Sequence, residues 1–259
     1  MAPMFTHYAP AFKWTSVFDK EYKIGNLERD MKKENTRALE TDPGFPRHRT
    51  LWQAVRPLID PSDLAHEALH VLRVYRWALR LSVGAGADPD LAGAAALVHD
   101  LVNIPKESAK RSIASSLSSA ESTPHLRLAG YSSRETEEIA DAVRTCSWSS
   151  GLPPSGPLGA VLQDADRLDA IGAIGIARTF ATAQAMASRG APLILWAPED
   201  PTCREREPDD RAFALDHFER KLLRLVDGMN LEAAMLEAEK RHALMRSFLM
   251  TLRRELEGG

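Results

Sequence analysis

Residues 64–83, LAHEALHVLRVYRWALRLSV, decide the fold class of this chain. Apolar side chains recur in this stretch at helical spacing and cover more than half of the circumference of the predicted helix. Such wide coverage is typical of a helix packed deep in a bundle. The following GAGADPD, residues 84–90, predicts the end of the helix, because glycine and proline interrupt helical structure.

Start and stop signals predict further helices along the chain. Ser132 and Glu135 have the spacing of a capping box, which predicts a helix over 134–145. The stretch 160–190 is long enough for two helices, and Gly172 lies near their expected join. These signals extend the helical pattern far beyond the first segment.

The remaining segments complete an all-α pattern. Residues 191–209 are rich in proline and charge, which predicts a long ordered loop or lid. No credible set of strands is present, so the sequence predicts an all-α helical bundle. Further helices are expected over 91–102, over 105–120 with Pro105 in the first turn, over 209–229 and over 231–256.

The composition restricts the class of protein. The chain has 259 residues, of which 44% are hydrophobic and 27% are charged, and this excludes wholesale disorder, a collagen-like chain and a coiled-coil rod. A net charge of -3 argues against broad coating of nucleic acid, so no nucleic-acid partner is expected. Two cysteines without a paired spacing, and the lack of a long uncharged apolar run, predict a cytoplasmic protein that does not enter a membrane.

Residues 1–47 differ from the rest of the chain. Aromatic residues come first, followed by the charged stretch LERDMKKENTRALE and the breaker DPGFP. We interpret residues 1–47 as an N-terminal extension of unknown role, with one exposed helix between Leu27 and Leu39, and residues 48–259 as the main domain.

Three separated segments carry side chains that suit metal chemistry. His66 and His70 are one helical turn apart and share a helix face. His99 and Asp100 follow the apolar residues 91–98, so we expect them where a buried helix meets a cavity. A bound cation would offset the cost of a buried charge there. The third segment supplies three carboxylates, Asp164, Asp166 and Asp169.

These residue types favour an open metal site. Imidazole nitrogens and carboxylate oxygens together suit one divalent ion of Mn, Fe, Co, Ni, Zn or, with more water, Mg. No cysteine lies at these points, which argues against a closed structural zinc site. A metal ion with open coordination positions lowers the pKa of a bound water and polarises the oxygen under attack. The residues therefore predict a metal-dependent hydrolase.

The order of the motifs resembles a known superfamily. HVLRV at 70–74, HD at 99–100 and DADRLD at 164–169 are similar to the pattern of the HD-domain superfamily of metal-dependent phosphohydrolases. The stretches LVHDLVNIPKESAKRSIAS and LQDADRLDAIGAIGIAR also resemble a subgroup of small stand-alone bacterial members. The resemblance spans about Leu64 to Leu256 and implies an HD-type helical bundle for residues 48–259.

The resemblance also implies roles for particular residues. The implied metal ligands are His70, His99, Asp100 and Asp166. Asp100 would also orient the attacking water, and the other residues expected to take part in catalysis are His66 and Lys106. The residues expected at the substrate are Arg73, Lys106, Arg111 and Asp169, with Arg167 as a further anion candidate. Asp169 could instead bind Arg73.

The expected reaction is hydrolysis of a phosphate ester or anhydride of a nucleotide or another small phosphorylated metabolite. Cys146 stands where the resembling proteins carry a histidine, which leaves the substrate and a second metal open. The same residues would also suit a catalytically divergent sensor that binds a nucleotide or a partner protein. An HD-fold metal oxygenase would need further histidines between Asp100 and Asp166, where the chain has only His125, and a lyase that acts on a specialised metabolite would use the same single metal. Whether the apolar faces of the C-terminal helices close the core or form a homodimer is left open.

Overall fold

The computed structural model describes residues 45–60, 67–104, 108 and 111–258, all within the compact unit Asp42–Gly259. These residues form no strand, and a single isolated bridge joins Ile194 to Phe213. The all-α prediction is therefore confirmed. The described helices are α2 (Pro46–Val55), α3 (Ala68–Ala85), α4 (Pro89–Val98), α5 (Ala114–Leu128), α6 (Ser133–Thr145), α7 (Gly156–Asp169), α8 (Gly172–Ser188), α9 (Asp216–Arg220) and α10 (Glu232–Leu256).

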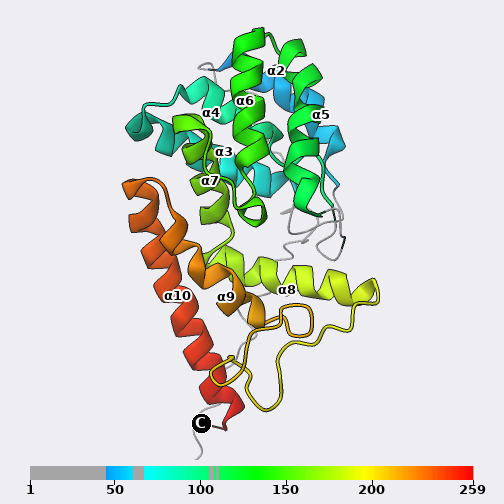
Figure 1. Ribbon diagram of the computed structural model, residues 1–259, viewed down its shortest axis with the longest axis vertical. Coiled ribbons are helices and arrows are strands. Elements are labelled where there is room, and N and C mark those ends of the chain that lie inside the picture. Colours follow the sequence, from blue (N-terminus) through cyan, green and yellow to red (C-terminus); the bar gives the residue numbers. More distant parts are fainter. Residues whose placement is uncertain (1–44, 61–66, 105–107, 109–110, 259) are drawn as a thin grey trace, which may run out of the picture. The chain divides into compact units, whose positions relative to one another are not determined.

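Helix α3 is the packing centre of the site region, where it contacts both α4 and α7 (Figure 1). Its apolar residues Val74 and Ala78 are fully buried, as the wide apolar coverage of this segment predicts. The helix ends at Gly86, whose φ of 68° is the left-handed conformation that glycine adopts without strain. This packing brings His70 of α3 to the ends of its two neighbours.

Helix α4 is short and buried on every side. The Asp88 side chain accepts a hydrogen bond from the Asp90 backbone N–H, which caps the first turn. All residues from Leu91 to Val98 are buried. The helix ends at Val98, so His99 and Asp100 lie in the turn that follows it.

Helices α6, α7 and α8 follow the predicted signals. Ser132 and Glu135 form both hydrogen bonds of the capping box at the start of α6. The join of α7 and α8 lies at Gly172, which has a φ of 77°. Two helices in the stretch 160–190 are therefore confirmed, and α7 ends with the carboxylates that face α3.

The helix expected over 91–102 ends at Val98, and two further helical segments differ from the sequence expectation. The helix expected over 105–120 begins only at Ala114, after a short turn at Arg111–Ile113, and Pro105 lies outside the described residues. The segment 209–229 forms the short helix α9 and two single turns, because Lys221 has non-helical backbone angles and interrupts the helix. This break turns Lys221 toward the site.

A loop separates α8 from α9, as the proline-rich and charged composition predicts. The Asp216 carboxylate is fully buried and accepts hydrogen bonds from both terminal nitrogens of Arg206, at 2.6 and 2.7 Å, and from the Asp209 backbone N–H. The loop is thereby fixed to the start of α9.

Some expectations fall outside these residues. The helix between Leu27 and Leu39 is one of them, and the boundary at residue 47 stays a prediction. Among the described helices, none has the length and hydropathy that a bilayer span requires.

Candidate metal centre

His70 is held in one orientation by a buried carboxylate. Its Nδ1 lies 2.7 Å from Asp169 Oδ2, and both side chains are 1% exposed. Burial alone would raise the pKa of Asp169, but hydrogen bonds from His70 and Arg73 hold it below its usual value, so the carboxylate is ionised. A carboxylate can only accept, so His70 Nδ1 carries the proton and the lone pair is on Nε2.

His99 is held in the same tautomer by the backbone of α4. Its Nδ1 lies 2.8 Å from the carbonyl oxygen of Ala96, which also can only accept. The proton is therefore on Nδ1, and Nε2 carries a lone pair that can bind a metal.

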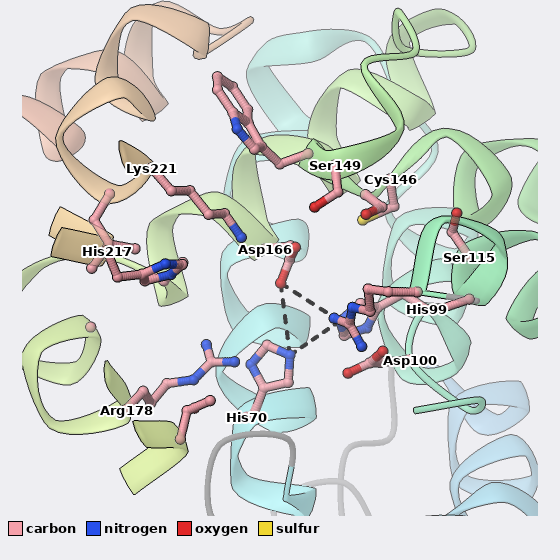
Figure 2. Close-up of a pocket in the computed structure, with 18 of the residues that line it drawn as sticks. His70, His99, Asp100, Ser115, Cys146, Ser149, Asp166, Arg178, His217 and Lys221 are labelled. Carbon is pink, nitrogen blue, oxygen red and sulfur yellow. Dashed lines mark hydrogen bonds and ion pairs between the residues drawn. The ribbon is translucent and has the colours of Figure 1, made fainter. Parts of the chain in front are cut away.

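The Nε2 atoms of His70 and His99 face each other at 3.2 Å (Figure 2). Asp166 Oδ1 lies 3.7 Å from His70 Nε2 and 3.8 Å from His99 Nε2. Asp100 completes a group with both histidines whose possible ligand atoms lie within 4.8 Å of one another. The site thus collects two imidazole lone pairs and two carboxylates.

This donor set fits a divalent cation. Two lone pairs at hydrogen-bond distance repel each other unless a proton or a cation lies between them. Burial and the charge of Arg178 lower the pKa of His70 to about 4, so a proton does not fill this role at neutral pH. The cluster could therefore hold a divalent metal through nitrogen and oxygen ligands.

The structure pairs Asp169 with Arg73, which is one of the two roles expected for this carboxylate, and neither side chain lines the pocket. Arg73 binds the carboxylate of Asp169 through Nε at 2.6 Å and a terminal nitrogen at 3.1 Å. Arg178 binds Asp169 Oδ2 at 2.8 Å. Asp169 is buried and engaged by three side chains, so the expectation of substrate contact is not met and its contacts are those of a residue that orients His70. Arg73 is engaged by this carboxylate and does not line the pocket.

Arg167 is also unavailable to an anion. Its guanidinium is buried and donates to the carbonyl oxygen of Gly228 and to Gln163. Asp164, one turn before it, is fully buried and accepts hydrogen bonds from Asn230 and Leu231. Asp164 therefore anchors the start of α10, and Arg167 anchors the turn at Val226–Gly228 that precedes it.

Basic side chains line the other walls of the pocket, a cavity of about 110 Å³. Figure 2 shows Lys221, His217 and Arg178 across the cavity from His99 and Asp100. Arg111, which was expected from the sequence, lines the pocket too and donates to the carbonyl oxygen of Ile104 at 2.6 Å. Metal ligands and cations therefore share one small cavity.

Three of these wall residues were missed by reasoning from the sequence. None of His217, Lys221 and Arg178 was selected from the sequence. His217 and Lys221 are one helical turn apart in the sequence, and this spacing was the signal that could have indicated a shared face. In the structure α9 ends between them, at Arg220. Nothing in the local sequence around Arg178 distinguishes it from a surface arginine.

Cys146 lies at the edge of the pocket and is buried. Burial and the charges of Asp166 and Asp100 raise the pKa of its thiol well above the usual value. A nucleophilic thiolate is therefore not favoured here. His66 and Lys106 lie outside the described residues.

Acid is expected to lower the stability of the metal-free protein, because His70 has a lowered pKa in the folded chain. Because its pKa is lowered from 6.5 to about 4 in the folded chain, the unfolded chain binds more protons between these values. The free energy of unfolding should therefore fall as pH falls from about 6.5 to 4. Urea titrations at several pH values, in the presence of a chelator, measure this slope. The variant His70→Asn should show a smaller slope, and equal slopes for the two proteins would contradict the assignment.

Comparisons with known proteins agree with this geometry. Residues 68–171 match the family model described as HD domain. The chain is 33% identical over 208 residues to the uncharacterized protein YpgQ of Bacillus subtilis, with 79% of this chain and 91% of that protein covered.

Solved structures with similar folds cover most of the chain. YpgQ in complex with ADP superposes with a TM-score of 0.60 at 31% identity, over 80% of this chain and 97% of that chain. A Lactobacillus plantarum protein has a TM-score of 0.66 at 26% identity, with 82% and 98% covered. A Bacillus thuringiensis protein described as an HD-superfamily hydrolase has a TM-score of 0.57 at 28% identity, with 82% and 97% covered. These matches and the His-His-Asp cluster support a metal-dependent hydrolase, and the chain belongs to the HD-domain superfamily.

Proposed function

We propose that this chain is a divalent-metal-dependent phosphohydrolase that acts on a phosphate ester or anhydride of a nucleotide or another small phosphorylated metabolite. The observation that carries the proposal is the shared cavity. One wall presents the lone pairs of His70 and His99, the facing walls present Arg178 and Lys221, and Arg111 lines the same cavity from its contact with Ile104. A phosphoryl group needs both a bound cation and neutralising side chains.

His70, His99, Asp100 and Asp166 would hold the ion, which when bound lowers the pKa of a water and polarises a phosphoryl oxygen. Asp100 lies beside the two histidines and would also orient the attacking water and accept its proton. Asp169 keeps the His70 lone pair directed at the ion.

The cations that line the cavity would bind the phosphoryl oxygens. Burial lowers the pKa of Lys221, whereas the charge of Asp166 raises it. An arriving phosphate would act in the same direction as Asp166 and favour the charged amine. Arg178 is fixed by Asp169, and Arg111 by Ile104, so both guanidinium groups are positioned in advance of binding.

A larger outer pocket of about 850 Å³ adjoins the metal site and shares several wall residues with it, including Arg111, Trp148 and Lys221. Its wall combines apolar side chains such as Met186 and Leu193 with polar ones. This space is large enough for the organic part of a small metabolite. The ADP complex of YpgQ supports a nucleotide as the substrate class.

The test is release of phosphate or pyrophosphate from nucleoside mono-, di- and triphosphates and sugar phosphates. Each is incubated with Mn, Mg, Co, Ni or Fe(II), and a chelator serves as the control. Metal-dependent and chelator-sensitive release from a narrow subset is expected. No release from any compound, with metal and ADP both bound, would overturn the hydrolase and favour the sensing role.

A further inference from the structure

His217 forms a dyad with a carboxylate on the wall of the pocket opposite the metal cluster. Its Nδ1 lies 2.9 Å from Asp210 Oδ2, and Asp210 Oδ1 lies 3.1 Å from Nε of Arg220. The carboxylate accepts from Nδ1, which fixes the orientation of the ring and leaves Nε2 as its second proton site. Figure 2 shows the His217 ring directed into the cavity, near Lys221 and Arg178 and across from His99 and Asp100.

His217 also lies where the two pockets meet. It lines both the metal cavity and the larger outer pocket. A substrate with its phosphoryl group at the metal cluster and its remainder in the outer pocket would cross this junction. The bond broken in hydrolysis joins these two parts, so the leaving-group oxygen would lie at the junction beside His217.

We propose that His217 is the general acid that protonates the leaving-group oxygen, and that Asp210 is its positioning residue. This inference rests on the proposed phosphohydrolase function. The water oxygen forms a bond to phosphorus on the side of Asp100, and the bond from phosphorus to the leaving-group oxygen breaks on the side of His217. His217 Nε2 gives its proton to the departing oxygen, while a proton of the water passes to Asp100. Solvent then returns a proton to the ring.

The opposite placement of the two residues is what an in-line displacement requires. Water attacks from one side of phosphorus, and the leaving group departs from the other. Asp100 and His217 occupy opposite walls of the cavity.

Arg111, Thr179 and Lys221 also line both pockets. Arg111 stays protonated throughout, because a guanidinium does not release its proton near neutral pH. The Thr179 hydroxyl already donates to the carbonyl oxygen of Gly175 at 2.8 Å. Lys221 is the chemical rival, since burial lowers the pKa of its amine.

A general acid and a phosphate-binding residue differ in whether their effect depends on the leaving group's need for a proton. Nitrophenyl phosphate releases nitrophenolate, which leaves without a proton. A nucleoside 5′-monophosphate releases an alkoxide, which needs one. If the enzyme cleaves triphosphates between the α- and β-phosphates, two analogues form the matched pair. One nucleoside triphosphate carries a β,γ-CF₂ bridge and the other a β,γ-CH₂ bridge. The CH₂-bridged bisphosphonate is the more basic leaving group. Rates with a basic and a weakly basic leaving group are compared for each variant.

The variant His217→Gln should lose roughly 100-fold or more in kcat with the basic leaving group and only a few-fold with the weakly basic one. The variant Asp210→Asn should show the same selectivity to a smaller degree. The variant Lys221→Gln should lower both rates equally, as expected for a residue that binds phosphate. The control His125→Gln removes a histidine that lies 3.7 Å from Glu121 and outside the pocket, so both rates should be unchanged.

Equal losses for the two leaving groups in His217→Gln would overturn the general-acid role and leave the hydrolase assignment intact. Selectivity in Lys221→Gln alone would assign the acid to Lys221 and also overturn it. Wild-type protein that releases phosphate or pyrophosphate from no compound of the panel, with metal and ADP bound, would overturn the inference together with the proposed function. Metal content, measured by atomic spectroscopy, should be equal in wild type and His217→Gln, because the change leaves the ligands in place.

Discussion

Replacing His99 with alanine is expected to abolish metal-dependent turnover. The change removes one of the two Nε2 lone pairs that converge at 3.2 Å. The chain also loses the hydrogen bond from His99 Nδ1 to the Ala96 carbonyl at the end of α4. The loss of this bond lowers stability by only about 1 kcal/mol. Activity should therefore disappear while the protein remains folded.

Two measurements check this expectation. Titration calorimetry with Mn should show loss of binding, and circular dichroism should show unchanged helix content. Asp166→Ala should behave in the same way, because its Oδ1 faces both imidazoles. The control His125→Ala removes an imidazole from α5 and should keep both metal binding and activity. A His99→Ala protein with full activity and no bound metal would overturn the proposed metal site.

The fold was predictable because its signals are local. The wide apolar coverage of residues 68–85 requires a buried helix wherever the rest of the chain lies. Capping by Ser132 and the left-handed turn at Gly172 likewise depend only on nearby residues. The short helix α9 was not predicted, because its apolar pattern continues past Lys221, where the backbone leaves the helical conformation.

The site was predictable only in part, for a similar reason. His70, His99 and Asp166 lie in compact sequence motifs, and the structure brings them together. His217 and Arg178 come from a loop-bound short helix and from α8, and their position in the pocket depends on tertiary packing. Of the two roles expected for Asp169, the pairing with Arg73 is present, whereas the additional contacts with His70 and Arg178 depend on tertiary packing that a sequence does not show.

Asp169→Asn is expected to weaken both metal binding and the fold. The carboxylate is 1% exposed and accepts from His70, Arg73 and Arg178. An amide has the same shape but no charge, so two guanidinium groups lose their counterion in the protein interior. Breaking a buried ion pair in this way costs about 3–5 kcal/mol of stability. The amide can also donate to His70 Nδ1, which favours the tautomer that places the proton on Nε2 and blocks the ligand lone pair.

A matched variant separates the two effects. Asp164 lies on the same helix, is fully buried and accepts from Asn230 and Leu231 instead of a site histidine. Asp164→Asn should therefore lower the free energy of unfolding in urea but leave the affinity for Mn unchanged. Asp169→Asn should lower the free energy of unfolding and, in addition, reduce the affinity for Mn by about 10–100-fold, the usual effect of removing the residue that orients a ligand histidine. Wild-type affinity for Mn in Asp169→Asn, measured at a temperature where the variant is folded, would mean that His70 keeps its tautomer without the carboxylate. Asp169 would then serve the fold through its two arginines and not the metal site.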